Sequence, residues 1–141
     1  MSFPQLDMSH PIFRDYTWEL DVVPPWRVED CEHCLEFTQP ESAGAVHISG
    51  AWKSNGVVSE TEMLSQVTEH CSDDAEPEKV RCGAFAGYVA EYVDWQEGTF
   101  WKKWFVARGR SLLFISYNCP QGDEDFETEE VTSLLSSLRS K

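Results

Sequence analysis

Basic residues are scarce in this sequence: 11 Lys and Arg stand against 25 Asp and Glu, which gives a net charge of −14 at pH 7. A surface with this charge repels phosphate backbones and anionic lipid headgroups. We therefore expect neither nucleic acid nor a membrane surface as a partner, whereas a basic protein would be attracted to the chain.

Long apolar runs and a leader segment are also missing. No stretch approaches the roughly 20 apolar residues of a transmembrane helix. The first residues, Met1–Asp7, have neither a basic start nor an apolar run, so the sequence shows no signal peptide. Five cysteines, an odd number without a secretory signal, fit free thiols in a reducing compartment. These features predict a cytoplasmic protein.

The sequence motifs of common enzymes are absent as well. There is no G-x-S-x-G of serine hydrolases and no Gly-rich phosphate loop. The acidic segments 73–78 and 123–130 lack the ligand spacing and central Gly of an EF-hand. An enzyme is therefore unsupported, although a site assembled from dispersed residues would look the same.

The 141 residues suit a single domain, because 41% are hydrophobic and 13% aromatic. A chain of this length buries roughly 68% of its unfolded surface. Residues 1–15 contain two prolines and little periodicity, which predicts an irregular N-terminal arm. The sequence contains no internal repeat and no dividing linker, so we expect one domain over residues 1–141.

Apolar segments separated by short connections predict an antiparallel sheet. The segments 82–95, 99–107 and 111–118 are joined by Gly-containing turns typical of hairpins. Residues 112–115 are all apolar, so we expect Phe114 and Ile115 to be buried on opposite faces. Alternating patterns predict a half-buried strand over 16–22 and an antiparallel pair formed by 33–38 and 44–52.

Two amphipathic segments predict helices. Ser59 and Glu62 have the spacing of a capping box, with Met63, Leu64, Val67 and Cys71 following at helical spacing. An acidic loop is expected over 72–79. An apolar stripe at Val131, Leu134, Leu135 and Leu138 predicts a second helix that closes the chain. The order predicts an α+β fold, with an antiparallel sheet flanked by two main helices on opposite faces (an α/β/α sandwich); both helices on one face is the alternative.

Cys31-Glu32-His33-Cys34 is the one motif with the form of a redox or metal site. It leads into a strand pattern, whereas a redox Cys-x-x-Cys sits at a helix N-terminus. A zinc site needs about four ligands, and His70-Cys71 is a candidate second pair. Because no second Cys-x-x-Cys exists, we expect no structural metal at Cys31, His33 and Cys34, and no cofactor.

Aromatic and cationic side chains concentrate in the predicted hairpin 99–118. Trp and Arg are common anchors of protein interfaces. The alternative is that the aromatics fill the core while Lys stems cover them. The candidate partner-binding residues are Trp101, Lys102, Lys103, Trp104, Arg108 and Arg110.

Several stretches resemble the PsbP-like domains in the order of their elements and their apolar positions. These stretches are 16–26, 37–48, 100–105, 112–117 and 131–138. This fold is known from an oxygen-evolving accessory protein of photosystem II, from a Ran-binding nuclear transport factor and from many uncharacterised bacterial proteins. The resemblance implies an antiparallel sheet between helices and a non-catalytic accessory or binding role.

The sequence therefore predicts a non-catalytic protein-binding or accessory protein, of the kind found in bacterial toxin–immunity or secretion systems. The alternative is a small-molecule or metal-binding domain, with or without hydrolytic activity, that uses a cleft near the Trp-rich strands. An exposed aromatic patch would favour the first function. A deep pocket with convergent polar groups would favour the second.

Overall fold

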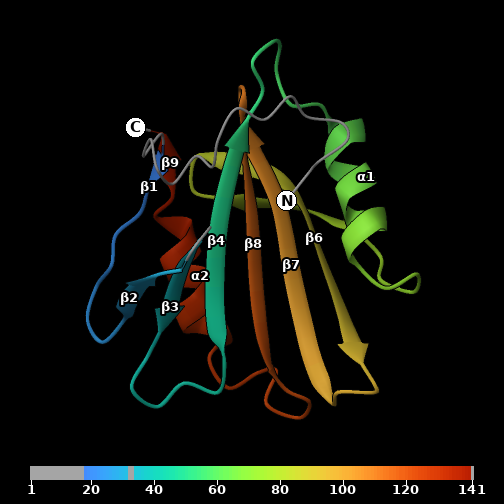
Figure 1. Cartoon of the computed structure of the whole chain (residues 1–141). Coiled ribbons are helices and arrows are strands. Elements are labelled where there is room, and N and C mark those ends of the chain that lie inside the picture. The colour runs from blue at the N-terminus through green and yellow to red at the C-terminus, as the bar shows by residue number, and fades with distance from the viewer. Residues whose placement is uncertain (1–17, 32–33, 141) are drawn as a thin grey trace.

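A seven-stranded antiparallel sheet forms the centre of the molecule (Figure 1). The computed structural model describes residues 18–31 and 34–140, so the predicted N-terminal arm lies outside the described residues. The strand order is β2-β3-β4-β8-β7-β6-β5. These strands are β2 (Arg27–Asp30), β3 (Leu35–Thr38), β4 (Ala45–Trp52), β5 (Glu78–Cys82), β6 (Phe85–Asp94), β7 (Thr99–Arg108) and β8 (Ser111–Pro120).

Two helices pack on opposite faces of the sheet. Helix α1 (Glu60–His70) places Met63 and Val67 in a cluster with Phe105 on what we call the α1 face. Helix α2 (Thr128–Ser136) packs with Ile48 on the other, or α2, face. The predicted α+β class with an antiparallel sheet is confirmed. Within the described residues, neither helix is long and apolar enough to cross a membrane.

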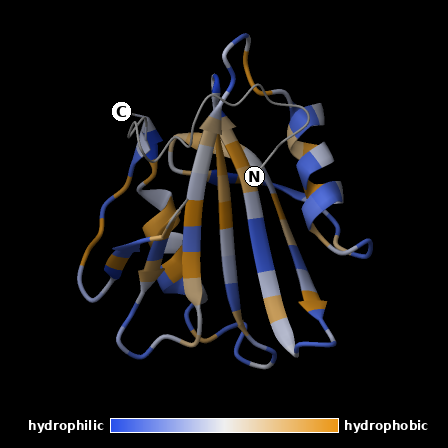
Figure 2. Ribbon diagram, viewed as in Figure 1, coloured by the Kyte–Doolittle hydropathy of each residue, from blue (hydrophilic) through white to orange (hydrophobic). Residues whose placement is uncertain are grey.

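The apolar run of β8 is buried on both faces, but unequally. Ile115 is 2% exposed in the α2-face cluster, as predicted. Phe114 is only half-buried, and it packs beside the α1-face cluster. The difference arises because α1 packs on β6 and β7, toward one side of that face. Hydrophilic and hydrophobic bands follow one another along the long strands (Figure 2).

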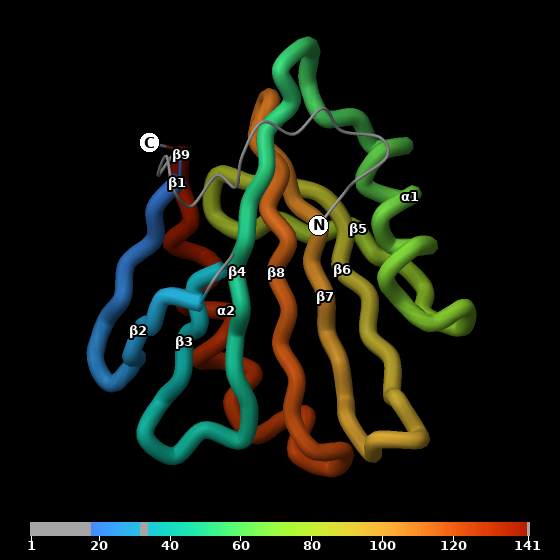
Figure 3. Tube along the Cα trace, in the orientation of Figure 1, coloured from blue at the N-terminus to red at the C-terminus, as the bar shows by residue number. Residues whose placement is uncertain are grey.

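A strand that the sequence did not predict, β5, follows α1 and forms a hairpin with β6. Residues 78–82 form β5, where an acidic loop was expected up to residue 79, and Lys79 pairs with Tyr88 of β6. The strand has mostly exposed side chains because it is the edge of the sheet, so it lacks an apolar pattern. Its turn reaches behind β4 and β8 (Figure 3), where the Ala84 N–H donates to the Leu138 carbonyl over 2.8 Å.

The second helix ends earlier than predicted. Helix α2 stops at Ser136, and residues 139–140 form β9 (Arg139–Ser140), which pairs with β1 (Trp18–Glu19) in a separate two-stranded sheet. Arg139 pairs with Asp21 at 3.0 Å, which favours this extended ending. The predicted strand over 16–22 is shorter as well. Residues 16–17 lie outside the described residues, and Val22 is exposed.

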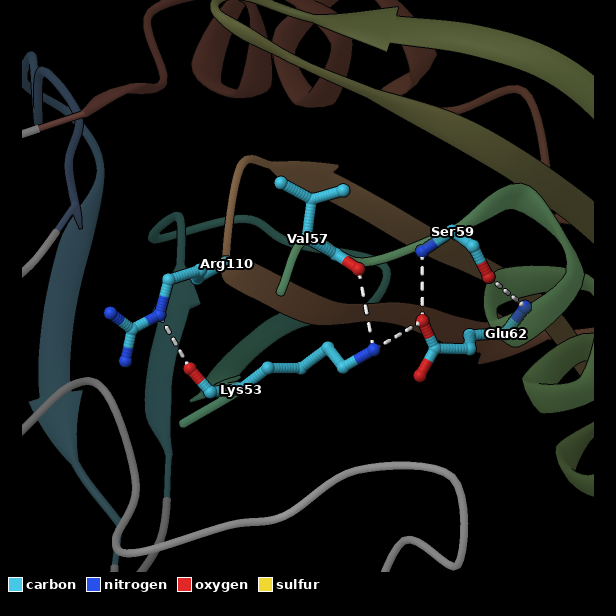
Figure 4. A network of polar contacts seen from close by, with 5 residues as sticks. All are labelled: Lys53, Val57, Ser59, Glu62 and Arg110. Carbon is cyan, nitrogen blue, oxygen red and sulfur yellow. Dashed lines mark hydrogen bonds and ion pairs between the residues drawn. The ribbon is translucent and has the colours of Figure 1, made fainter. Parts of the chain in front are cut away.

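The predicted capping box of α1 is confirmed (Figure 4). The Glu62 N–H donates to Ser59 Oγ at 3.1 Å, and the Ser59 N–H donates to Glu62 Oε1 at 2.9 Å. Lys53 Nζ donates to the same Glu62 oxygen at 2.9 Å, and Arg110 Nε donates to the Lys53 carbonyl at 2.7 Å. The network therefore joins the start of α1 to the β7–β8 turn.

A buried carboxylate connects α2 to the sheet. Glu127, only 2% exposed, accepts from Tyr117 Oη at 2.8 Å, Gln39 Nε2 at 2.9 Å, Ser42 Oγ at 3.3 Å and the Gly44 N–H at 2.9 Å. Four donors offset the loss of water around a buried charge. The β3–β4 turn is thereby held against the start of α2.

Candidate functional site

Strand register assembles a line of polar side chains across the α1 face. Glu36 lies opposite His47, His47 opposite Ser116, and Ser116 opposite Lys103. We call these four residues the polar row. They come from β3, β4, β8 and β7, which are neighbours in the sheet but distant in the sequence.

A pocket of about 170 Å³ opens over the inner part of the polar row. The next register line supplies an aromatic floor, since Phe114 lies opposite Phe105. His70, the last residue of α1, stacks on the Phe105 ring with centroids 6.2 Å apart. The pocket is lined by His47, Ser49, His70, Lys103, Phe105, Phe114, Ile115 and Ser116.

Lys103 supplies the positive charge of this pocket. Its Nζ donates to the His70 carbonyl at 2.9 Å and lies 4.8 Å from the Trp101 ring centroid and 5.4 Å from that of Tyr92. No carboxylate in the described part of the chain pairs with Lys103. Its charge is therefore held by aromatic faces and a carbonyl, and it remains available to an anion.

Two hydroxyls in the pocket also lack a partner among the described residues. Within residues 18–31 and 34–140, the side chains of Ser49 and Ser116 form no hydrogen bond. His47 Nε2 is instead bonded to Glu36 Oε2 at 2.9 Å. Because His47 is not hydrogen-bonded to Ser116, the row does not contain a nucleophile paired with a base. Its hydroxyls are placed to bind a ligand.

Cysteines gather at the outer end of the polar row. Cys31 and Cys34 flank the turn between β2 and β3, where the Cys31 N–H donates to the Cys34 carbonyl at 2.8 Å. The ligand atoms of Cys31, Glu36 and His47 all lie within 4.8 Å of one another. We call Cys31, Cys34, Glu36 and His47 the cysteine cluster; each member is partly buried.

The Cys34 thiol is held in its neutral form in this cluster. Burial, followed by the hydrogen bond to Cys31 and the charges of Cys31 and Glu36, raises the pKa of Cys34 to about 12. A redox Cys-x-x-Cys requires a lowered pKa, usually from a helix N-terminus, and this motif instead lies in a hairpin turn. The cluster therefore does not have the electrostatics of a disulfide oxidoreductase.

The residues predicted to bind a partner do not form one surface. Lys102 and Trp104 lie on the α2 face, where Lys102 Nζ is 5.3 Å from the Trp104 ring centroid and Trp104 is 4% exposed. Trp101 and Lys103 point to the α1 face, next to the pocket.

The two arginines of that set lie at the β7–β8 turn. Arg108 and Arg110 are both exposed, and the Arg110 guanidinium lies 4.8 Å from the centroid of the Trp52 ring. The predicted interface is thus divided among three places, and its role in binding stays a prediction.

Sequence reasoning missed four polar members of the two sites: Glu36, His47, Ser49 and Ser116. Each belongs to a strand that the sequence predicted, but their proximity depends on pairing between β3, β4 and β8. His70 and Cys71, the sequence-based candidates for completing a metal site, lie instead at the end of α1. His33 is outside the described residues.

No protein-family model matches this sequence, and no curated protein matches it. A crystal structure of a protein from Bacteroides thetaiotaomicron VPI-5482 is similar in fold, with a TM-score of 0.61 and 18% sequence identity. The match covers 89% of this chain and 45% of the Bacteroides chain, so this chain spans less than half of that protein. At this identity the likeness concerns the fold alone.

Proposed function

We propose that the protein is a non-catalytic binding protein whose pocket on the α1 face takes a small organic anion. The observation that carries this proposal is the convergence of the Lys103 ammonium and the hydroxyls of Ser49 and Ser116 on one pocket with an aromatic floor. In a chain with a net charge of −14, Lys103 has no carboxylate partner among the described residues and lines a pocket together with two hydroxyls.

The size and lining of the pocket define the ligand class. About 170 Å³ is below the roughly 300 Å³ at which drug-sized pockets begin. Phe105 and Phe114 offer apolar area for a flat body, while Lys103 offers a charge-assisted hydrogen bond. A small aromatic or short-chain carboxylate matches both parts.

The test compares benzoate with benzamide, its neutral counterpart of similar shape, by calorimetric titration. We expect benzoate to bind more tightly, and Lys103→Met to weaken benzoate about tenfold or more, because a charged hydrogen bond contributes about 1.5–3 kcal/mol. Met keeps an apolar stem against Trp101 and Tyr92.

Lys102→Met is the matched control, since Lys102 is the next residue on β7 but lies on the α2 face. It should leave benzoate binding unchanged. Equal binding of benzoate and benzamide, or equal losses in the two lysine variants, would contradict the proposed pocket chemistry.

Binding to another protein, as in bacterial toxin–immunity or secretion systems, is a second candidate. Trp95 and Phe126 are 73% and 63% exposed, and they lie in the β6–β7 turn and the β8–α2 connection. The Gln121 N–H donates to the Gly98 carbonyl at 2.9 Å, which joins these two segments. Carboxylates at 94, 97 and 123–125 surround them, so a basic partner fits this end.

Pull-down from the native host with Trp95→Ala/Phe126→Ala tests the second candidate. A salt-sensitive basic partner should be retained by the wild type and by Val57→Ala, an exposed apolar residue in the β4–α1 connection, and lost from the double variant. A partner that the double variant retains would contradict this assignment.

We infer further that the chain is a cytoplasmic, bacterial member of the PsbP-like fold. The two helices on opposite faces of an antiparallel sheet support this inference. A solved PsbP-like domain that superposes with β4, β8, β7, α1 and α2 in the same connectivity would test it, and a different strand order would contradict it.

A further inference from the structure

We propose that Cys31, Cys34, His47 and Glu36 bind one zinc ion at the outer end of the polar row. The Cys-x-x-Cys motif supplies the two thiolates, and β3 and β4 supply the carboxylate and the imidazole. This proposal is independent of the anion pocket, although His47 borders both sites.

Three of the four donor atoms already lie near the spacing of a tetrahedral site. Zinc bonds of about 2.0–2.3 Å place neighbouring ligand atoms roughly 3.3–3.8 Å apart. The atoms of Cys31, Glu36 and His47 already lie within 4.8 Å of one another, and Glu36 Oε2 is 2.9 Å from His47 Nε2. Small rotations therefore suffice for these three side chains to reach one ion, and a rotation of the Cys34 side chain adds the fourth ligand.

Backbone structure places the second thiol beside the first. The Cys31 N–H donates to the Cys34 carbonyl at 2.8 Å, which closes the turn between β2 and β3 and brings the two cysteines together. Two Cys separated by two residues is the spacing with which zinc sites bind their first ligand pair. The sheet register adds the second pair, because Glu36 and His47 lie directly opposite one another.

The donor set selects zinc among common divalent ions. Two sulfurs, one imidazole nitrogen and one carboxylate oxygen form a borderline-soft set, whereas calcium and magnesium require oxygen ligands. On binding, the two thiols lose their protons to solvent, and Glu36 and His47 exchange their mutual hydrogen bond for bonds to the metal. Four protein ligands make a closed, structural site that fastens the β2–β3 hairpin to β4.

The experiment uses the full chain, kept reduced, stripped with EDTA and titrated with zinc against a chromophoric chelator. We expect one zinc per chain and a higher unfolding temperature with zinc. Cobalt should give tetrahedral visible bands together with a thiolate-to-cobalt charge-transfer band. Cys31→Ser, Cys34→Ser and His47→Gln should each weaken zinc binding by tenfold or more.

Cys71→Ser and His33→Gln are the matched controls, and both should keep the wild-type zinc affinity. Substoichiometric zinc in the wild type, or a cobalt complex without the charge-transfer band, would overturn the site. A loss of zinc affinity in His33→Gln without such a loss in His47→Gln would overturn the ligand assignment.

Circular dichroism of each stripped variant separates loss of metal binding from loss of fold. Lys103→Met should bind zinc with the wild-type affinity even if it no longer binds benzoate, which keeps this proposal separate from the anion pocket.

Discussion

At the scale of single residues, Glu127 has the largest expected effect on stability. Replacing it with Gln keeps the volume but removes the charge and turns an amide N–H toward donors. We expect Glu127→Gln to lower the free energy of unfolding by about 2–4 kcal/mol, measured by urea unfolding. Exposed Glu129 in the first turn of α2 is the control, and Glu129→Gln should change the value by less than about 0.5 kcal/mol. Equal effects would contradict a special role for Glu127.

Gly83 is a second residue that the fold requires. Its φ is +59°, and a Cβ at this position would lie 2.1 Å from the Leu138 carbonyl oxygen. We expect Gly83→Ala to lower the free energy of unfolding by more than about 1 kcal/mol. Gly98→Ala is the control, because its φ is also positive, at +64°, while its Cβ would meet nothing within 4 Å. An equal loss in both variants would mean that backbone strain alone, without the close approach, accounts for the effect.

At the scale of elements, the start of α1 depends on the charge of Glu62. Burial raises the pKa of this carboxyl. The hydrogen bonds from Ser59 and the Lys53 ammonium lower the pKa by more than burial raises it, so the pKa falls below its ordinary value. Because the pKa of Glu62 is lower in the folded than in the unfolded chain, its charged form stabilises the fold at pH values above the unfolded pKa. That stabilisation is lost as the pH falls through the folded value.

Glu62→Gln should therefore lower the free energy of unfolding by about 0.5–1 kcal/mol at pH 7, and by progressively less in acid. Urea unfolding at several pH values measures this difference. Glu60→Gln, in the same helical turn but with an exposed side chain, should show little change at any pH. A pH-independent effect of Glu62→Gln would exclude its charge as the cause.

The elements that could be predicted from the sequence are those with local signals. Ser59 and Glu62 identify α1, and the apolar run 112–115 identifies β8. Strand β5 escaped prediction because an exposed edge strand has no apolar alternation. The end of α2 was misplaced because buried Leu138 continues the helical spacing although it lies beyond the last turn.

The candidate sites were less predictable than the fold. Cys31 and Cys34 are visible as a motif, and alternation places His47 and Ser49 on one face of their strand. The ligands that complete each site depend on which strands are neighbours, and hydrophobic alternation does not specify that. A metal site was predicted to be absent for want of a second ligand pair, and in our proposal Glu36 of β3 and His47 of β4 are that pair.

At the scale of the whole molecule, the charge of −14 acts against compactness. Carboxylates repel one another more in the folded chain than in the expanded one, and salt screens this repulsion, with a Debye length of about 8 Å at 0.15 M. We expect sodium chloride between low and physiological ionic strength to raise the free energy of unfolding by about 1 kcal/mol. Potassium chloride should act equally, and a loss of stability with either salt would contradict the prediction.

The central place of β8 has a consequence for the synthesis of the chain. Strand β8 joins β4 to β7, so the two halves of the sheet meet only through a strand made late. While the ribosome translates residues 53–110, β4 has an unpaired edge, and unpaired edges invite association with other chains. Pairing across this sequence separation slows folding. We therefore expect nascent chains arrested before residue 111 to bind chaperones, and chains extended past residue 120 to be released from them.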